Sequence, residues 1–153
     1  MSVTYVGAGG LQTSATAATI NITAPTCAAD DILICALFLK SASAECVGQE
    51  PAGWASVDAG SHSNGTNRVC LFWKRAVGGD SGASFTFGKD VDDNVLFAGI
   101  ISAWRGALTS GNPFDGSPSY SDNASGDTVT YATLDPSVAA HVLGDNGGEA
   151  AGQ

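Results

Sequence analysis

The sequence of 153 residues is long enough for one domain with a substantial core. Charged residues are 14% of the chain, against a usual share of about 25%, and the 20 glycines favour turn-rich β structure over helices with charged faces. A net charge of −9 with six Lys and Arg residues offers no cluster of cations for phosphate backbones or anionic lipids, so we expect no nucleic-acid or membrane partner.

From the N-terminus, residues 2–6 predict a short strand, and residues 7–10 predict a glycine turn. A dinucleotide-binding loop is the alternative, but its G-x-G-x-x-G pattern requires glycine where Gln12 stands, and the Thr- and Ser-rich sequence that follows is typical of a loop. Residues 19–23 alternate polar and apolar side chains, which predicts a half-buried strand that ends before Pro25.

The strongest predicted element is the run of eight apolar residues between Asp31 and Lys40. It is too short for a membrane helix, which needs about 20 apolar residues, and it has the length of a strand buried on both faces. A second apolar run at 95–104 is its counterpart. We expect these two strands to lie side by side in the middle of a β core.

Shorter elements fill the rest of the chain. Residues 41–53 predict a polar loop, and residues 60–66 predict a loop with an Asn-Gly turn. Residues 68–76 predict another central strand, because both of their alternating faces are mostly apolar. The remaining predicted strands are 54–58, 83–87, 127–132 and 137–143.

These segments predict an all-β fold of about eight or nine strands, arranged as an antiparallel β-sandwich that is jelly-roll-like. We expect a single domain over residues 1–143 and a Gly-rich acidic tail, a loop or frayed end, over residues 144–153. The first residues have neither the basic region nor the apolar core of a secretory signal, so we expect a cytosolic origin.

The four cysteines, Cys27, Cys35, Cys46 and Cys70, contain no C-x-x-C spacing, so we expect neither zinc nor any other cofactor. Cys35 and Cys70 lie inside apolar strands and are predicted to be buried thiols. Cys27 and Cys46 flank the first core strand, where a disulfide is conceivable, but a cytosolic origin favours free thiols.

The sequence Gly79-Asp80-Ser81-Gly82 matches the nucleophile box of chymotrypsin-like proteases over four residues. His62 is an available base, but it lies in a short polar loop, and that family needs two barrels where this chain has one domain. A glycine-rich hairpin turn is the favoured interpretation. We therefore expect no catalytic residues and no enzyme activity.

Two further groups are candidates for ligand binding. Asp90, Asp92, Asp93 and Asn94 gather oxygen ligands of the kind that hold Ca²⁺, but the EF-hand pattern does not fit, and a solvated acidic loop at a strand end is favoured. Aromatic residues, Trp54 and Tyr120 in particular, are candidates for stacking on sugars, although strand aromatics more often belong to the core.

Several short segments together resemble β-sandwich proteins encoded in phage and prophage structural modules, namely residues 31–34, 51–54, 73–76, 84–87, 103–107 and 112–115. The similarity covers about residues 1–143 and leads us to expect further strand sequence after Leu143. It implies a virion component (capsid decoration, tail or fibre-associated) and supplies no catalytic residues.

We therefore expect a non-enzymatic virion structural protein that acts by protein–protein contact. The implied partners are other virion proteins and further copies of the chain, and the implied location is the virion, assembled in the host cytoplasm. A carbohydrate-binding β-sandwich module that uses Trp54 and Tyr120 on glycans is the alternative.

Overall fold

The computed structural model describes residues 2–41, 43–57, 62–63, 67–90 and 95–114. Within these ranges the chain forms nine strands and no helix, and hence no helix that is long and apolar enough to cross a membrane. The prediction of an all-β antiparallel fold is confirmed. The strands are β1 (Thr4–Ala8), β2 (Gln12–Ser14), β3 (Thr19–Thr23), β4 (Ile32–Leu39), β5 (Ala55–Ser56), β6 (His62–Ser63), β7 (Arg68–Arg75), β8 (Ser84–Gly88) and β9 (Phe97–Arg105).

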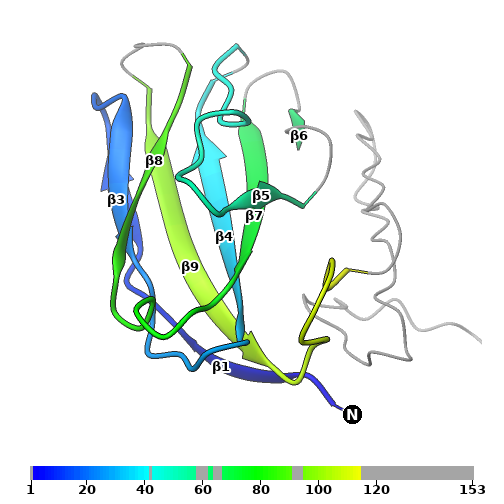
Figure 1. Ribbon diagram of the computed structural model, residues 1–153. Helices are drawn as coiled ribbons and strands as arrows, with labels where there is room; N and C mark the ends of the chain where they lie inside the picture. Colours follow the sequence, from blue (N-terminus) through cyan, green and yellow to red (C-terminus); the bar gives the residue numbers. More distant parts are fainter. Residues whose placement is uncertain (1, 42, 58–61, 64–66, 91–94, 115–153) are drawn as a thin grey trace, which may run out of the picture.

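Seven strands make one large sheet in the order β1-β9-β4-β7-β5, in which β2 also pairs with β9 and β6 with β7 (Figure 1). β4 is hydrogen-bonded along its whole length, to β9 on one side and to β7 on the other. The two apolar runs are therefore adjacent in the middle of the sheet, as predicted. Cys35, for example, lies between Ile101 and Phe72.

β3 and β8 form a separate two-stranded sheet along one side of the large sheet (Figure 1). Ile20, Ile22 and Phe87 of this small sheet are buried in the same core cluster as the inner side chains of the large sheet. The approach is close at Gly99 of β9, where an added Cβ would lie 2.4 Å from Cδ1 of Ile22. Side chains of the two sheets are thus in contact, while the closed sandwich and the jelly-roll-like arrangement stay predictions.

The two faces of β4 are not buried equally. Leu33, Cys35, Leu37 and Leu39 belong to the core cluster, whereas the alternate side chains from Ile34 to Phe38 are half-buried. Side chains alternate across a strand, so these two rows point to opposite faces of the sheet. The prediction that β4 is buried on both faces is therefore confirmed for its inner face, whereas its outer face is mostly half-buried.

Several boundaries differ from the sequence-based prediction. β1 continues through Gly7 to Ala8 past a register shift, and β2 lies where the sequence predicts a loop, because both strands find ladder partners in β9. Gly9 is required between them, since a Cβ there would lie 2.0 Å from the carbonyl oxygen of Thr23. The predicted glycine turn over 7–10 is therefore wrong in its first half, which is strand, and Gly9 is needed for the close approach of two backbone segments.

β5 is shorter than the predicted strand 54–58, and β6 is a short strand inside the predicted loop 60–66. β6 pairs with β7 from His62↔Val69 to Ser63↔Arg68, so the predicted Asn-Gly turn falls in the connection between them. That turn, the predicted strands 127–132 and 137–143, the domain limit at 143 and the tail 144–153 lie outside the described residues.

Candidate functional site

The protease-like box at 79–82 forms a turn that is tied into the core by Asp80. Both carboxylate oxygens of Asp80 accept hydrogen bonds from Nζ of Lys74, at 2.7 and 2.8 Å, and Oδ2 also accepts one from the amide of Val77 at 2.8 Å. The Lys74 and Asp80 side chains are only 15% and 8% exposed, and the ammonium lies 5.0 Å from the centre of the Phe85 ring. Asp80 therefore acts here as the buried counter-ion of Lys74.

Ser81 is engaged with the backbone of a neighbouring loop. Its Oγ accepts a hydrogen bond from the amide of Cys27 at 3.2 Å, and the amide of Ala83 donates to the carbonyl of Asp80 at 3.0 Å within the turn. These contacts are those of a turn, as the sequence favours, but the turn joins β7 to β8, which lie in different sheets and do not pair, so the prediction of a hairpin is wrong.

The backbone positions of Ser81 and His62 lie toward opposite ends of β7. His62 pairs with Val69 near the first residue of β7, whereas Asp80 is held by Lys74 near the last residue. At about 3.4 Å per residue, about 17 Å of strand separates Val69 from Lys74. Nucleophilic catalysis needs the serine and the base within hydrogen-bonding reach, and this topology does not bring their backbones together.

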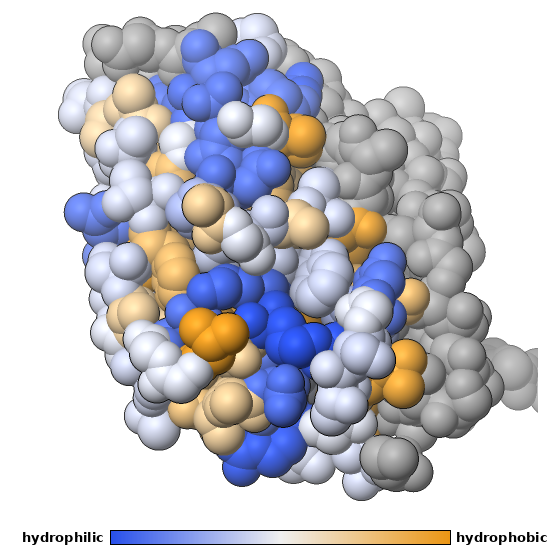
Figure 2. Space-filling model, in the orientation of Figure 1, coloured by the Kyte–Doolittle hydropathy of each residue, from blue (hydrophilic) through white to orange (hydrophobic). Residues whose placement is uncertain are grey.

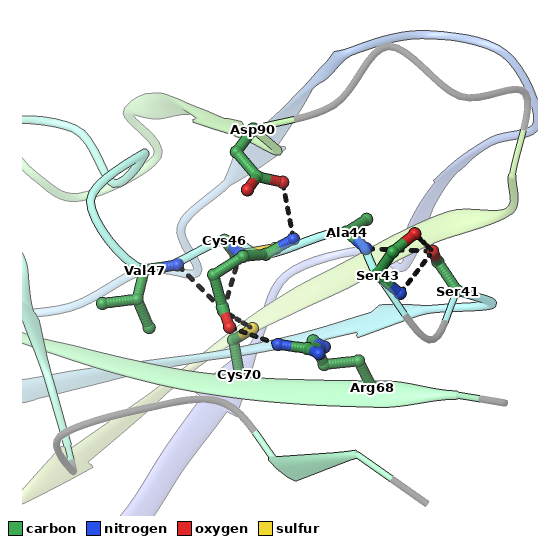
Figure 3. Close-up of polar contacts among 9 residues, drawn as sticks. Ser41, Ser43, Ala44, Cys46, Val47, Arg68, Cys70 and Asp90 are labelled. Carbon is green, nitrogen blue, oxygen red and sulfur yellow. Dashed lines mark hydrogen bonds and ion pairs between the residues drawn. The ribbon is translucent and has the colours of Figure 1, made fainter. Parts of the chain in front are cut away.

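Glu45 is the centre of a polar cluster in the loop after β4, and its partners Cys46, Val47, Arg68 and Cys70 are labelled in Figure 3. Its Oε1 accepts hydrogen bonds from the amides of Cys46 at 2.9 Å and Val47 at 3.2 Å and from Sγ of Cys70 at 3.6 Å. Its Oε2 forms an ion pair with Nη1 of Arg68. One carboxylate thus connects the loop to β7 through two side chains.

Asp90 is bound to the same loop, through the backbone of Glu45 (Figure 3). The Glu45 amide donates to Oδ1 of Asp90 at 2.7 Å, and the Asp90 amide donates to the Glu45 carbonyl at 2.9 Å. This first member of the candidate Ca²⁺ group therefore fastens the segment after β8 to the loop. Asp92, Asp93 and Asn94 lie outside the described residues, and the described part of the chain contains no group of three or more metal-ligating side chains.

All four cysteines are free thiols, and Cys35, Cys46 and Cys70 are buried. The burial of Cys35 and Cys70 is as predicted, and no disulfide joins Cys27 to Cys46. A hydrogen bond with Cys70 is the main cause that raises the pKa of Cys46, and burial raises it further. Burial is the main cause that raises the pKa of Cys35 and of Cys27, and nearby acidic groups or thiols raise it further, so all three cysteines favour the unreactive thiol form.

Trp54 lies in the core, with 6% of its surface exposed. Its ring makes edge contacts with Phe85 at 5.2 Å and Phe87 at 5.1 Å between ring centres. A sugar platform needs an exposed ring face, and this ring is covered by the aromatics of β8. Tyr120, the other residue of the carbohydrate interpretation, lies outside the described residues.

The last charged contact, between Arg105 and Asp31, lies at one end of the large sheet. Arg105, the final residue of β9, donates Nε to Oδ1 and Nη2 to Oδ2 of Asp31, each at 2.8 Å. Oδ2 of Asp31 also accepts the amide of Ala28 at 2.8 Å. The hydrogen bonds from Arg105 are the main cause that lowers the pKa of Asp31, which stays ionised although only 2% of its side chain is exposed.

Asp31, Asp80 and Ser81 thus hold the loops around Cys27 near the last residues of β7, and Glu45 holds the loop beside Arg68 near its first residue. No family model, no curated protein and no solved structure matches this chain.

Proposed function

We propose that this chain is a non-enzymatic virion structural protein, a capsid-decoration, tail or fibre-associated component that acts by protein–protein contact. The resemblance of its ordered sequence segments to phage structural β-sandwich proteins is what suggests the virion. The confirmed all-β fold is compatible with that class, and we include the β-sandwich with a jelly-roll-like arrangement in the proposal.

The observation that carries the proposal is that most basic side chains bind oxygen atoms of the chain itself. Four of the six basic residues bind carboxylates or carbonyl oxygens of the chain itself, namely Arg68, Lys74, Arg75 and Arg105. Few cations are therefore left without an internal partner, and on the face in Figure 2 the apolar groups form separate patches among residues of intermediate and hydrophilic character. Such a surface suits contact with other proteins better than contact with polyanions.

The proposed partners are other virion proteins and further copies of this chain. Several large apolar side chains are available for such contacts, since Tyr5, Leu11, Val77 and Leu108 are 54%, 63%, 59% and 47% exposed. Apolar and aromatic side chains of this kind are enriched at the centre of protein interfaces. The proposed location is the virion, assembled in the host cytoplasm.

Mass spectrometry of purified particles from the virus or lysogen that encodes the chain tests the proposal. We expect peptides of this chain at a fixed ratio to the major capsid or tail protein, and light scattering of the purified chain should give an oligomer. A chain that is missing from washed particles and monomeric in solution would refute the proposal.

A further inference from the structure

Two thiols from distant parts of the chain, those of Cys46 and Cys70, lie side by side in the core. Cys46 belongs to the loop after β4, Cys70 lies near the first residue of β7, and the two residues are 1% and 0% exposed. The thiols are hydrogen-bonded to each other, and this contact is the main cause that raises the pKa of Cys46. Folding therefore places the sulfur atoms of the loop and of β7 in direct contact.

The carboxylate of Glu45 fixes the relative position of the two cysteines. Its Oε1 accepts both the amide of Cys46 at 2.9 Å and Sγ of Cys70 at 3.6 Å (Figure 3). Its Oε2 is paired with Arg68, which also lies on β7. The loop cannot carry Cys46 away from Cys70 without breaking these bonds, so the two thiols stay within reach of each other.

The other two cysteines are less well placed to bond with Cys70. The register of β4 and β7 sets Cys35 opposite Phe72 and Cys70 opposite Leu37, so Cys35 and Cys70 are diagonal neighbours. Diagonal side chains lie about 7 Å apart, whereas a disulfide needs Cβ atoms about 4 Å apart. Cys27 lies near the last residues of β7, at the other end of that strand.

We propose that Cys46 and Cys70 form a redox site, at which a peroxide converts the two neighbouring thiols into a disulfide that joins the loop after β4 to β7. Hydrogen peroxide suits this site because it is small and uncharged, whereas both cysteines are closed to bulkier reagents. The inference depends on the arrangement of the thiols and not on the proposed virion role.

The reaction needs a proton acceptor, and Glu45 already accepts the hydrogen bond of the Cys70 thiol. The Cys70 sulfur attacks a peroxide oxygen and its proton passes to Oε1 of Glu45; the O–O bond breaks, and the departing hydroxide takes that proton to form water. The Cys46 sulfur then attacks the sulfenic acid sulfur of Cys70, and the S–O bond breaks as the second hydroxide leaves with the Cys46 proton as water. Two thiols lose two electrons and two protons, and one peroxide becomes two waters.

Treatment of the reduced, full-length chain with hydrogen peroxide tests the site. After removal of the peroxide, the chain is denatured and its free thiols are alkylated for mass spectrometry. We expect the number of alkylated cysteines to fall from four to two in a product of monomer mass, with one linked peptide pair that contains Cys46 and Cys70. The urea midpoint should rise on oxidation and return to its first value with dithiothreitol.

Two variants provide the controls. Cys35→Ala removes an equally buried thiol of the same core and should leave the disulfide unchanged. Cys46→Ala should prevent it and leave a sulfenic acid at Cys70 that dimedone traps.

The unsubstituted chain decides the question even if a variant fails to fold. Four alkylated thiols after peroxide treatment, a link that involves Cys27 or Cys35, a disulfide-linked dimer, or separate oxidation of Cys46 and Cys70 to sulfinic acids would each overturn the proposal.

Discussion

Arg105 and Asp31 form a two-point ion pair that joins the end of β9 to the residue before β4, with both N–O distances at 2.8 Å. The carboxylate is buried and also accepts the amide of Ala28, so it anchors the loop that enters the central strand. The guanidinium is 56% exposed and keeps part of its hydration. The carboxylate of Asp31 is therefore removed from water, whereas the guanidinium of Arg105 stays partly hydrated. The contribution of this ion pair to stability depends mainly on whether Asp31 is ionised.

The first prediction concerns this charge. Because the pKa of Asp31 is lowered in the folded chain, its ionised form contributes stability above the ordinary aspartate pKa of about 3.9, and this contribution is lost as the pH falls through the lower folded value. Asp31→Asn should lower the free energy of unfolding at pH 7 by about 1–3 kcal/mol. As the pH falls below 4, the free energies of unfolding of Asp31→Asn and of the unsubstituted chain, measured by urea titration, should converge.

Asp30→Asn is the matched control for Asp31→Asn. Asp30 is exposed and has a φ of 69°, a conformation that Asn also tolerates, so this variant should keep the parent stability at both pH values. Equal losses from the two substitutions would contradict the assignment.

The second prediction separates the two polar residues of the protease-like box. Asp80→Asn removes the counter-ion of a lysine that is mostly buried, and we expect the free energy of unfolding to fall by about 3 kcal/mol. Ser81→Ala removes one acceptor for an amide at an exposed site and should cost less than about 1 kcal/mol. Chemical denaturation measures both effects. An esterase or protease activity that is lost in Ser81→Ala while stability is retained would refute the turn assignment and the non-enzymatic proposal.

The third prediction concerns Trp54. Trp54→Ala leaves a cavity beside Phe85 and Phe87 and should lower the free energy of unfolding by about 3–5 kcal/mol. Tyr5→Ala removes an exposed aromatic that contacts only Trp104 among the described rings, and should cost about 1 kcal/mol. A Trp54→Ala variant that keeps its stability and loses binding on a glycan array would instead favour the carbohydrate module.

The fourth prediction concerns the contact between the two sheets at Gly99. A methyl group at this position would lie 2.4 Å from Cδ1 of Ile22 and 2.6 Å from Cδ2 of Leu37. Gly99→Ala should therefore lower the free energy of unfolding by about 1–3 kcal/mol through overpacking. Gly79→Ala, at a site with nothing within 4 Å of the added Cβ, should change it by less than about 1 kcal/mol. Similar midpoints for the two variants would contradict the prediction and would mean that the ends of the Ile22 and Leu37 side chains move aside to make room.

The fifth prediction concerns the thiols. Burial and raised pKa values should keep Cys35 and Cys46 unreactive toward a water-soluble disulfide reagent in the native chain at pH 8, with Cys27 reacting slowly and before any other. In denaturant all four cysteines should react. Rapid native reaction at Cys46, or a titre below four thiols in denaturant, would contradict the described burial and free state.

The sequence alone determines those strands whose burial is evident from the order of their apolar residues. The apolar runs at 32–39 and 95–104 and the alternation at 19–23 and 83–87 identify β4, β9, β3 and β8, because apolar side chains must leave water and a strand presents them with a period of two. The buried thiol of Cys35 follows from the run at 32–39, and that of Cys70 follows in the same way from the apolar strand at 68–76.

Contacts between distant segments are decided by the tertiary structure. β2 has little strand character of its own and exists because β9 supplies hydrogen-bond partners at Gly99, Ala98 and Phe97. Glu45 lies in a loop, and its local sequence does not predict its contacts. Its carboxylate binds Arg68 and Cys70, which are 23 and 25 residues away in the sequence, because the folded chain places them beside it. The local sequence shows whether a side chain prefers to be buried. Which distant residue it then contacts is decided by how the two sheets and their loops pack.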